Sequence, residues 1–489
     1  MKRRRERFKG LFYILLPAGG VLFLLWYLKA AGADVVYSDY FRIINDYLPD
    51  VTDPGRFLVP DILTRIPITF LQRLANVTYF SYSVTFDRLC GLLGIAMTAG
   101  GISVYARRMG IGRRWLLAAL LAVFCLNKWE ILLNGTAWVH MFSLGLFFIN
   151  FYLFDLLWIG ESTARDDLML CIMPFLWLLT AGEYVLSYFV IMILASLFGI
   201  LTGGAARRGT SDQRLFFSIM SCSIIALTLY LFSRSFAVWE HSGAVEASQM
   251  GLIGLVKEQP LFLPVFFVKS FASAIIGVES AQALALPEPL LLLLGLLLIA
   301  AYMLAIYLYF KGEMLEKTVF PLMLLFSGGL NHCMVTAARW IFLNDSYGMS
   351  SRYAGQYLPG ILGIFLIFAL YREEARPYRR LSGSAKSFIK IFLSLSTVCI
   401  LLGNCYTDVD EIRKAKYREA NFEEMTAVLR GHEAYEDEEL CRLLEWHKDP
   451  GELKNAIGIL ETQQLNVFKP AAPGIISVPE PGAAAGGNQ

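Results

Sequence analysis

Charged residues, histidines and paired cysteines are all scarce in this sequence. Only 17% of its 489 residues are charged, and no basic stripe of the kind that binds nucleic acid is present. The eight cysteines include no CxxC pair and lie mostly in apolar runs, which is typical of small buried residues. The five histidines are scattered, and we expect His140 and His332 to be packed and hydrogen-bonded rather than metal-bound. Nucleic acid is therefore not an expected partner, and no metal ligand set is predicted.

Apolar residues are abundant instead. The chain is 56% hydrophobic, with a mean hydropathy of +0.52, which is too apolar for a soluble protein of this length. Its apolar runs are continuous rather than alternating, which favours helices over a β-barrel. Runs of about 20 residues can span a bilayer. The sequence predicts an all-α polytopic membrane protein with about eleven transmembrane helices, at residues 11–28, 84–105, 115–126, 136–158, two within 169–201, 215–232, 290–310, 319–342, 357–370 and 388–403.

The basic residues predict how the chain is oriented in the cell membrane. The N-terminal "MKRRRERFKG" and the loops "ARRMGIGRR", "GGAARRGTSDQR" and "YREEARPYRR" are rich in Lys and Arg, as cytoplasmic segments are. The first apolar run is long and has no clean cleavage site, so it is predicted to be an uncleaved helix with a cytoplasmic N-terminus. Residues 261–278 are apolar but contain Pro264 and Lys269. A full crossing there would move "YREEARPYRR" outside, so we expect a re-entrant or interfacial segment.

The last part of the chain has a different composition. Residues 1–404 are predicted to form the membrane domain, whereas residues 405–468 are polar, acid-rich and helix-periodic. Asp449-Pro450-Gly451 predicts a break between two short helices. This region is interpreted as a small extracytoplasmic helical domain. The Pro/Gly/Ala-rich residues 469–489 are expected to be a disordered tail.

An external loop from residue 30 to about residue 80 follows the first helix. Its segment "YFRIINDYL" has the spacing of an interfacial amphipathic helix, with apolar residues on one face and charged residues on the other. The apolar residues are Phe41, Ile44 and Leu48, and the charged ones are Asp39, Arg42 and Asp46. A second segment, "PDILTRIPITFLQRL", carries Asp61, Arg65 and Arg73. Arginines and carboxylates at the bilayer edge suit a lipid with a phosphate head, because arginine binds phosphate and a carboxylate can act as a base.

The loop and three later motifs resemble the GT-C fold of polyprenyl-phosphate-sugar-dependent membrane glycosyltransferases. That family combines many transmembrane helices with a long first external loop, which bears interfacial helices and an early catalytic carboxylate. "KWEILLNG" resembles an external turn of bacterial members, "SSRYAGQYLPGI" resembles an Arg-Tyr motif before a late helix, and "GILETQQLNVF" resembles tails of bacterial cell-surface polysaccharide proteins. Many members carry adjacent acids in the first loop, whereas Asp39 is flanked by Ser38 and Tyr40. No cofactor is predicted, and a divalent metal stays possible.

The resemblance implies an inverting transfer on the extracytoplasmic side. The donor would be a sugar on a polyprenyl phosphate, and the acceptor a cell-surface glycan or a lipid-linked molecule among the membrane lipids. Asp39 would be the catalytic base, and Arg42, Arg65 and Arg352 would bind the donor phosphate. The further candidate site residues are Asp46, Asp61, Glu130 and Tyr353.

Each residue also has a structural interpretation. Asp39 could cap the helix that follows it, and Asp46 could pair with Arg42. Arg352 could anchor a helix end, and Glu130 could be solvated at an external turn. Asp87 and Arg88 are expected to pair within or between helices.

Two other classes of function stay open. A transporter or flippase of a lipid-linked sugar would need polar residues near the bilayer midplane in several helices. A non-catalytic scaffold of polysaccharide assembly is the third class. The residues do not identify the sugar, the acceptor or the oligomeric state.

Overall fold

The computed structural model describes residues 2–48, 50–55, 67–180, 185–204, 210–234, 245–373 and 383–470. Every regular element in these ranges is helical, and ten helices are long and apolar enough to cross a membrane. Helix α8, with 17 residues, is a shorter apolar helix beside them. The chain is therefore an all-helical polytopic membrane protein, as predicted. The turn predicted near Gly182-Glu183 and the tail 471–489 lie outside the described residues.

The helices follow one another along the chain. The first half of the chain contains α1 (Lys2–Ala31), α2 (Tyr40–Tyr47), α3 (Pro67–Phe80), α4 (Val84–Arg108), α5 (Arg113–Phe124), α6 (Trp129–Leu133), α7 (Trp138–Ile159), α8 (Ala164–Thr180), α9 (Val185–Thr202) and α10 (Thr210–Arg234). The second half contains α11 (Val245–Glu258), α12 (Phe262–Ala272), α13 (Val278–Ala283), α14 (Glu288–Lys311), α15 (Phe320–Arg339), α16 (Ser351–Glu373), α18 (Gly383–Arg430), α19 (Asp437–Leu443) and α20 (Pro450–Thr462). Short 3-10 turns, among them η2 (Leu126–Lys128), connect several of them, and another, η8 (Asn466–Phe468), follows α20.

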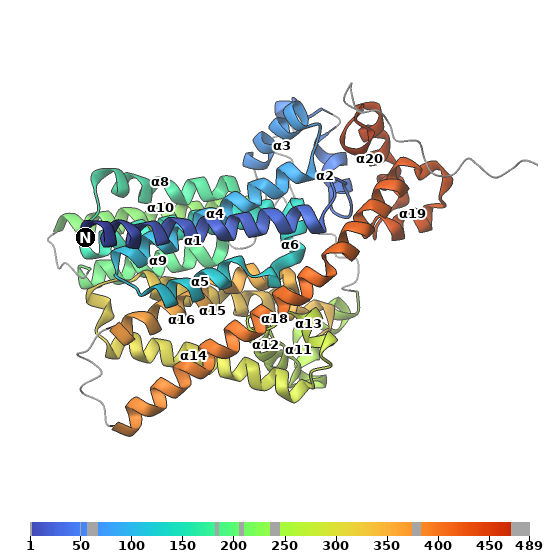
Figure 1. Cartoon of the computed structure of the whole chain (residues 1–489). Helices are drawn as coiled ribbons and strands as arrows, with labels where there is room; N and C mark the ends of the chain where they lie inside the picture. Colours follow the sequence, from blue (N-terminus) through green and yellow to red (C-terminus); the bar gives the residue numbers. More distant parts are fainter. Residues whose placement is uncertain are drawn as a thin grey trace, which may run out of the picture.

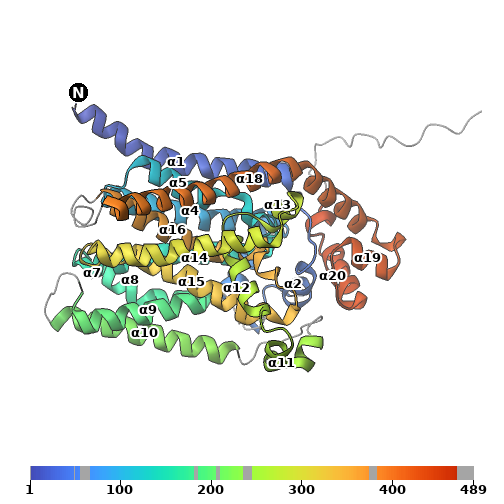
Figure 2. The ribbon, with the colours of Figure 1, turned by 90° about the horizontal axis from the view of Figure 1, so that it is seen from below.

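The long helices run side by side, and the bundle has two different ends (Figure 1). The N-terminus lies at one end, called the proximal end below. Helices α2, α19 and α20 lie together at the other end, called the distal end (Figures 1 and 2), and α3 lies near them on the side of the bundle (Figure 1). Within the bundle, α16 is almost wholly buried, whereas α1, α10 and α14 expose many large apolar side chains, as expected of lipid-facing helices. The predicted first loop and the C-terminal helices thus share one end of the molecule.

Glycines allow two helix pairs to approach closely. A Cβ atom added to Gly94 of α4 would lie 2.2 Å from the carbonyl oxygen of Met141 on α7. One added to Gly328 of α15 would lie 2.3 Å from the backbone nitrogen of Gly360 on α16. Small residues at such crossings are typical of membrane helices, whose association depends on van der Waals packing.

The segment predicted to be re-entrant bends at the distal end. Helices α11 and α12 meet at an angle of 93°. Helix α12 has 11 residues, about 16 Å, which is too short to cross a bilayer. Helices α11, α12 and α13 all lie toward the distal end (Figure 2), so this part of the chain does not traverse the bundle. The arrangement agrees with the predicted re-entrant or interfacial segment.

The predicted domain boundary after residue 404 falls inside one continuous helix. Helix α18 has 48 residues, about 72 Å, and runs from the proximal end out beyond the distal end (Figure 1). Its sequence changes from apolar to charged just after Gly403 and Asn404, but the helix continues through this point without a break. The two short helices predicted around Asp449-Pro450 are present as α19 and α20, and the Asp449 side chain caps α20 by accepting from the Glu452 backbone N–H.

The interfacial position predicted for "YFRIINDYL" is wrong, although the helix itself is present as α2. Phe41 and Ile44 are fully buried, and the ring of Phe41 meets Trp446 edge-on at 6.1 Å. The Gln463 side chain at the end of α20 donates to the backbone carbonyl of Leu48 at 2.9 Å. The apolar face of α2 is therefore covered by the C-terminal helices rather than by lipid. The first loop and the C-terminal helices form one packed unit.

Candidate functional site

An ion pair joins the short helix α6 to the start of α16 at the distal end. The Arg352 guanidinium, in the first turn of α16, binds the carboxylate of Glu130 on α6. The hydroxyl of Ser351 donates to the other Glu130 oxygen at 3.0 Å. The Arg352 side chain keeps 54% of its surface exposed, and Glu130 keeps 22%. The pair is therefore accessible from the distal side rather than sealed within the bundle.

Two more carboxylates act on the same guanidinium. Asp39, an exposed residue directly before α2, influences Arg352 electrostatically, and so does Glu445, which follows α19. Partial desolvation and the negative charge of Glu130 raise the pKa of Glu445, whereas Arg352 lowers it. Asp39, Glu130, Arg352 and Glu445 are called the Arg352 cluster below.

Tyr37 is a buried residue near the cluster. The centre of its ring lies 5.2 Å from that of Phe422 on α18. The charges of Glu130, Arg352 and Glu445 act on its side chain. Burial raises the pKa of its phenol, so it stays neutral. One carboxylate thus binds the arginine directly, and two more, from separate stretches of the chain, act on it electrostatically. Such a site can bind an anionic oxygen at the guanidinium and accept a proton at a carboxylate.

Asp39 and Arg42 do not share their neighbours, although they are one helical turn apart. Asp39 makes no side-chain hydrogen bond that caps α2. Arg42 forms an ion pair with Asp46 at 3.8 Å, as the structural interpretation of Asp46 predicted. Arg42 and Asp46 line a polar cleft of about 370 Å³ between α2 and α20, together with Asn45, Asp449, Glu452 and Asn455. Asp39 and Arg42 were expected to serve one substrate, but Asp39 acts on the Arg352 cluster whereas Arg42 lines the cleft beside α20.

The other predicted candidates fall outside the cluster. Tyr353 is buried beside Arg352 in sequence, but its ring lies near Tyr347 at 6.1 Å and under the guanidinium of Arg339 at 5.8 Å. Asp61 and Arg65 lie outside the described residues. The nearby Arg73 stacks on the ring of Tyr47 at 3.8 Å.

The expected pairing of Asp87 with Arg88 is wrong, because each bonds to other groups. The Asp87 carboxylate accepts from the Tyr40 hydroxyl at 2.9 Å and from the Asn76 amide at 2.8 Å. Arg88 donates to the backbone carbonyls of Leu133 at 2.6 Å and Ala33 at 2.8 Å. Consecutive residues on a helix point about 100° apart, so the two side chains reach different neighbours. Both fix the first loop onto the bundle.

His332 is packed and hydrogen-bonded, as predicted. Its ring lies between those of Phe271 at 3.7 Å and Tyr357 at 3.8 Å. Its Nδ1 atom is 3.0 Å from the hydroxyl of Ser270. This histidine belongs to the interior of the bundle and not to the Arg352 cluster.

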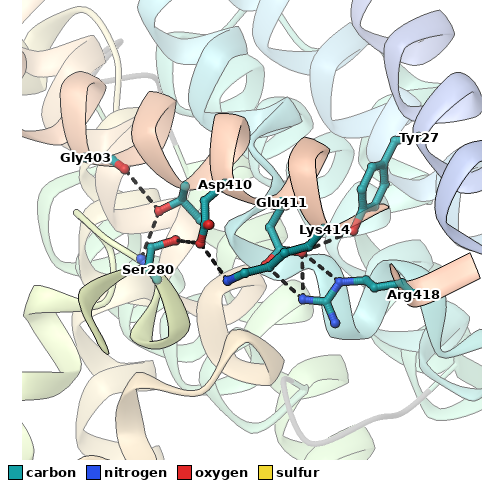
Figure 3. A network of polar contacts seen from close by, with 9 residues as sticks. Tyr27, Ser280, Gly403, Asp410, Glu411, Lys414 and Arg418 are labelled. Atoms are coloured by element: carbon teal, nitrogen blue, oxygen red, sulfur yellow. Dashed lines mark hydrogen bonds and ion pairs between the residues drawn. The ribbon is translucent and has the colours of Figure 1, made fainter. Parts of the chain in front are cut away.

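A second charged group lies along α18 and is paired internally (Figure 3). Lys414 binds Asp410 at 2.7 Å, and Arg418 binds both carboxylate oxygens of Glu411, each at 2.9 Å. Ser280 of α13 donates to Asp410 at 2.8 Å. On the other side of α18, the hydroxyl of Tyr27 on α1 lies 3.5 Å from Glu411. These residues, called the α18 network below, fix the long helix to α1 and α13.

Arg418 connects the α18 network to the Arg352 cluster. Its guanidinium carbon lies 3.2 Å from the centre of the Trp129 ring, and Trp129 directly precedes Glu130. Glu279 of α13 interacts electrostatically with both groups: with Glu130 of the Arg352 cluster, and with Arg418 and Glu411 of the α18 network. Burial, together with the negative charge of Glu130, raises the pKa of Glu279.

Sequence reasoning missed Glu445 and the α18 network. Glu445 stands between the buried residues Leu444 and Trp446 in a backbone conformation with φ of 55°, which no motif indicates. In the α18 network, the i,i+4 spacing of Asp410 and Lys414 was a signal that could have been found. Neither feature shows from the sequence alone which residues of other helices it meets.

The described residues contain no group of three His, Cys, Asp or Glu side chains arranged to hold a metal ion. Comparison of the chain with family models, with curated proteins and with solved structures finds no match. The chemistry of the site therefore rests on its own residues.

Proposed function

We propose that the protein is an inverting glycosyltransferase with a GT-C-like fold that uses a polyprenyl-phosphate-linked sugar. The observation that supports this most is the Glu130–Arg352 ion pair at one end of a membrane bundle, on which Asp39 also acts electrostatically. These residues come from the loop and two of the motifs that carry the resemblance. A phosphate attached to a membrane lipid must lie at the bilayer surface, and an arginine beside a carboxylate offers a phosphate donor and a base there.

In the proposed reaction, Asp39 accepts the proton of the acceptor hydroxyl. The hydroxyl oxygen then forms a bond to the anomeric carbon, and the bond between that carbon and the phosphate oxygen breaks. The polyprenyl phosphate leaves with the bonding electrons, and Arg352 stabilises its developing charge. A single displacement inverts the anomeric centre. The acceptor is a cell-surface glycan or a lipid-linked molecule.

The orientation is part of the same proposal. The basic N-terminus and the Arg107–Arg108 and Arg113–Arg114 pairs lie at helix ends that the positive-inside rule places in the cytoplasm. The distal end with the Arg352 cluster would then face the extracytoplasmic side of the cell membrane.

The Asp39→Asn variant tests the proposed base. It keeps the size of the side chain but cannot take up the proton, so we expect transfer to fall by about 10² to 10⁴. The assay uses a panel of synthetic polyprenyl-phosphate hexoses and pentoses in membranes that contain the native acceptor. Asp437→Asn, an exposed acid on the C-terminal helices, is the matched control and should keep wild-type transfer.

Two outcomes would contradict this proposal. Transfer at the wild-type rate by Asp39→Asn removes Asp39 from the mechanism. In sealed right-side-out vesicles, a membrane-impermeant acceptor should be modified from the outside, and modification only from the inside overturns the orientation.

A transporter or flippase of a lipid-linked sugar is the second candidate function. Polar side chains of several helices, among them Lys128, His140, Asn331 and Gln356, surround a cavity within the bundle. Buried polar groups in several helices are what a transport path requires. Movement of a labelled polyprenyl-phosphate sugar across liposomes by Asp39→Asn, with no transfer by the wild type, would favour this function.

A further inference from the structure

A small cavity lies inside the bundle next to the Arg352–Glu130 pair. Lys128 and Ile131, on either side of Glu130 in the chain, line it, and so do Gly355 and Gln356. The latter two follow Arg352 by one helical turn, so the cavity adjoins the pair on its membrane side. Its volume is about 20 Å³, which is enough for one water-sized molecule.

Lys128 is buried at this cavity, and the described part of the chain places no counter-ion beside it. Its side chain is 5% exposed, and its ammonium donates to the backbone carbonyl of Cys125 at 2.6 Å. No carboxylate of the described residues lies within ion-pair distance of it. Asp408 is the carboxylate that acts on it from farther away, and one Asp408 oxygen accepts from the Leu126 backbone N–H at 2.6 Å. An ammonium in a nonpolar interior with one neutral acceptor is electrostatically incomplete.

Asn331 offers the complementary group at the same cavity. Its side chain is 2% exposed, and its amide nitrogen donates to the backbone carbonyl of Gln356 at 2.8 Å. Its Oδ1 atom is buried and has no hydrogen-bond partner among the described residues. The cavity therefore presents a cation that lacks an anionic oxygen and an acceptor that lacks a donor.

We propose that Lys128 is an anion-binding residue for a phosphate headgroup that enters this cavity from the distal end. A phosphate oxygen would accept from the Lys128 ammonium, and a hydroxyl carried by the same ligand would donate to Asn331. A sugar linked to a lipid phosphate supplies both groups, and in this respect the inference rests on the proposed function. In the present conformation the space is too small for a phosphate. Entry requires the exposed Arg352 side chain to leave Glu130 and turn to the ligand.

Binding of farnesyl phosphate tests the inference without any sugar transfer. The probes are farnesyl phosphate, neutral farnesol and inorganic phosphate, and the readouts are the thermal unfolding temperature and the Kd in detergent. We expect farnesyl phosphate to stabilise the wild type and farnesol to have no effect. Lys128→Met should weaken farnesyl phosphate binding roughly 10- to 100-fold, because it removes a charge-assisted hydrogen bond. Lys454→Met, at an exposed surface pair, is the matched control and should bind like the wild type.

The ligand-free protein gives a second readout. An apolar side chain of similar length removes a buried uncompensated charge, so Lys128→Met without ligand should unfold at a temperature equal to or above that of the wild type. If this variant does not fold, Lys128→Gln removes the charge but keeps a donor for Cys125, and the same loss of binding is expected.

The outcomes separate the possible sources of the anion. Stabilisation by inorganic phosphate that Lys128→Met abolishes supports the anion site, with free phosphate as its source. Equal binding of farnesyl phosphate by the wild type and by Lys128→Met overturns the inference, and so does a wild type that binds neither phosphate. Wild-type binding that depends on Lys128, in a protein that transfers no sugar, leaves the site intact and removes only the proposed function.

Discussion

The Arg352 cluster and the α18 network contain the same kinds of residue, but their charges are arranged differently. In the α18 network, two cations meet two carboxylates: Lys414 pairs with Asp410 and also lies 4.0 Å from Glu411, Arg418 pairs with Glu411, and each carboxylate also receives a hydroxyl. In the Arg352 cluster, a single, half-exposed guanidinium binds one carboxylate, and two further carboxylates act on it electrostatically. The first arrangement satisfies itself and fixes helices. The second leaves a carboxylate and an arginine available to a ligand.

Removing Arg418 should have the largest effect on stability. Its partner Glu411 is 1% exposed, so Arg418→Met leaves a buried carboxylate without its closest ion pair, with only Lys414 remaining at 4.0 Å. We expect this to cost about 3 to 5 kcal/mol of unfolding free energy, measured by chemical unfolding in detergent. The double variant Glu411→Leu with Arg418→Met should recover much of the loss. A single variant as stable as the wild type would mean that the α18 network does not fix the helix.

Removing Arg352 should change stability little and sugar transfer strongly. The residue is half exposed, so Arg352→Met should change the unfolding free energy by less than about 1 kcal/mol. Sugar transfer should fall by about 10² to 10³, because the charge that develops on the leaving phosphate loses its donor. Both quantities are measured on the same purified variant. A large loss of stability with unchanged transfer per folded molecule would place Arg352 with the structural ion pairs.

The smallest expected effect concerns Glu279, which lies between the two groups. Burial raises its pKa above the ordinary value of 4.5, so folding favours its protonated form. The stability that this residue contributes is therefore fully present below pH 4.5 and is lost as the pH rises through its folded pKa. Glu279→Gln should unfold at a slightly higher temperature than the wild type at pH 7.5, and the difference should vanish toward pH 4.5. A difference that grows on acidification would contradict this sign.

The sequence determined those features that depend on local pattern. Long apolar runs predict the membrane helices, because a lipid environment requires each span to satisfy its own backbone hydrogen bonds. The period of "YFRIINDYL" predicts α2, and Asp449-Pro450 predicts the start of α20. Asp39, Glu130 and Arg352 could be singled out one by one, as charged residues at the ends of apolar runs.

The tertiary structure alone decided which partners these features meet. The apolar face of α2 is equally suited to lipid and to protein, and its partners in α20 come about 400 positions later, as in the contact between Asn45 and Asn455 with a separation of 410. Ser351 and Glu130 are 221 positions apart. Lys128 looks like an ordinary loop lysine until the fold buries it with no counter-ion among the residues that the structure describes. Hydrophobicity is read from composition, whereas electrostatic pairing depends on distances that only packing fixes.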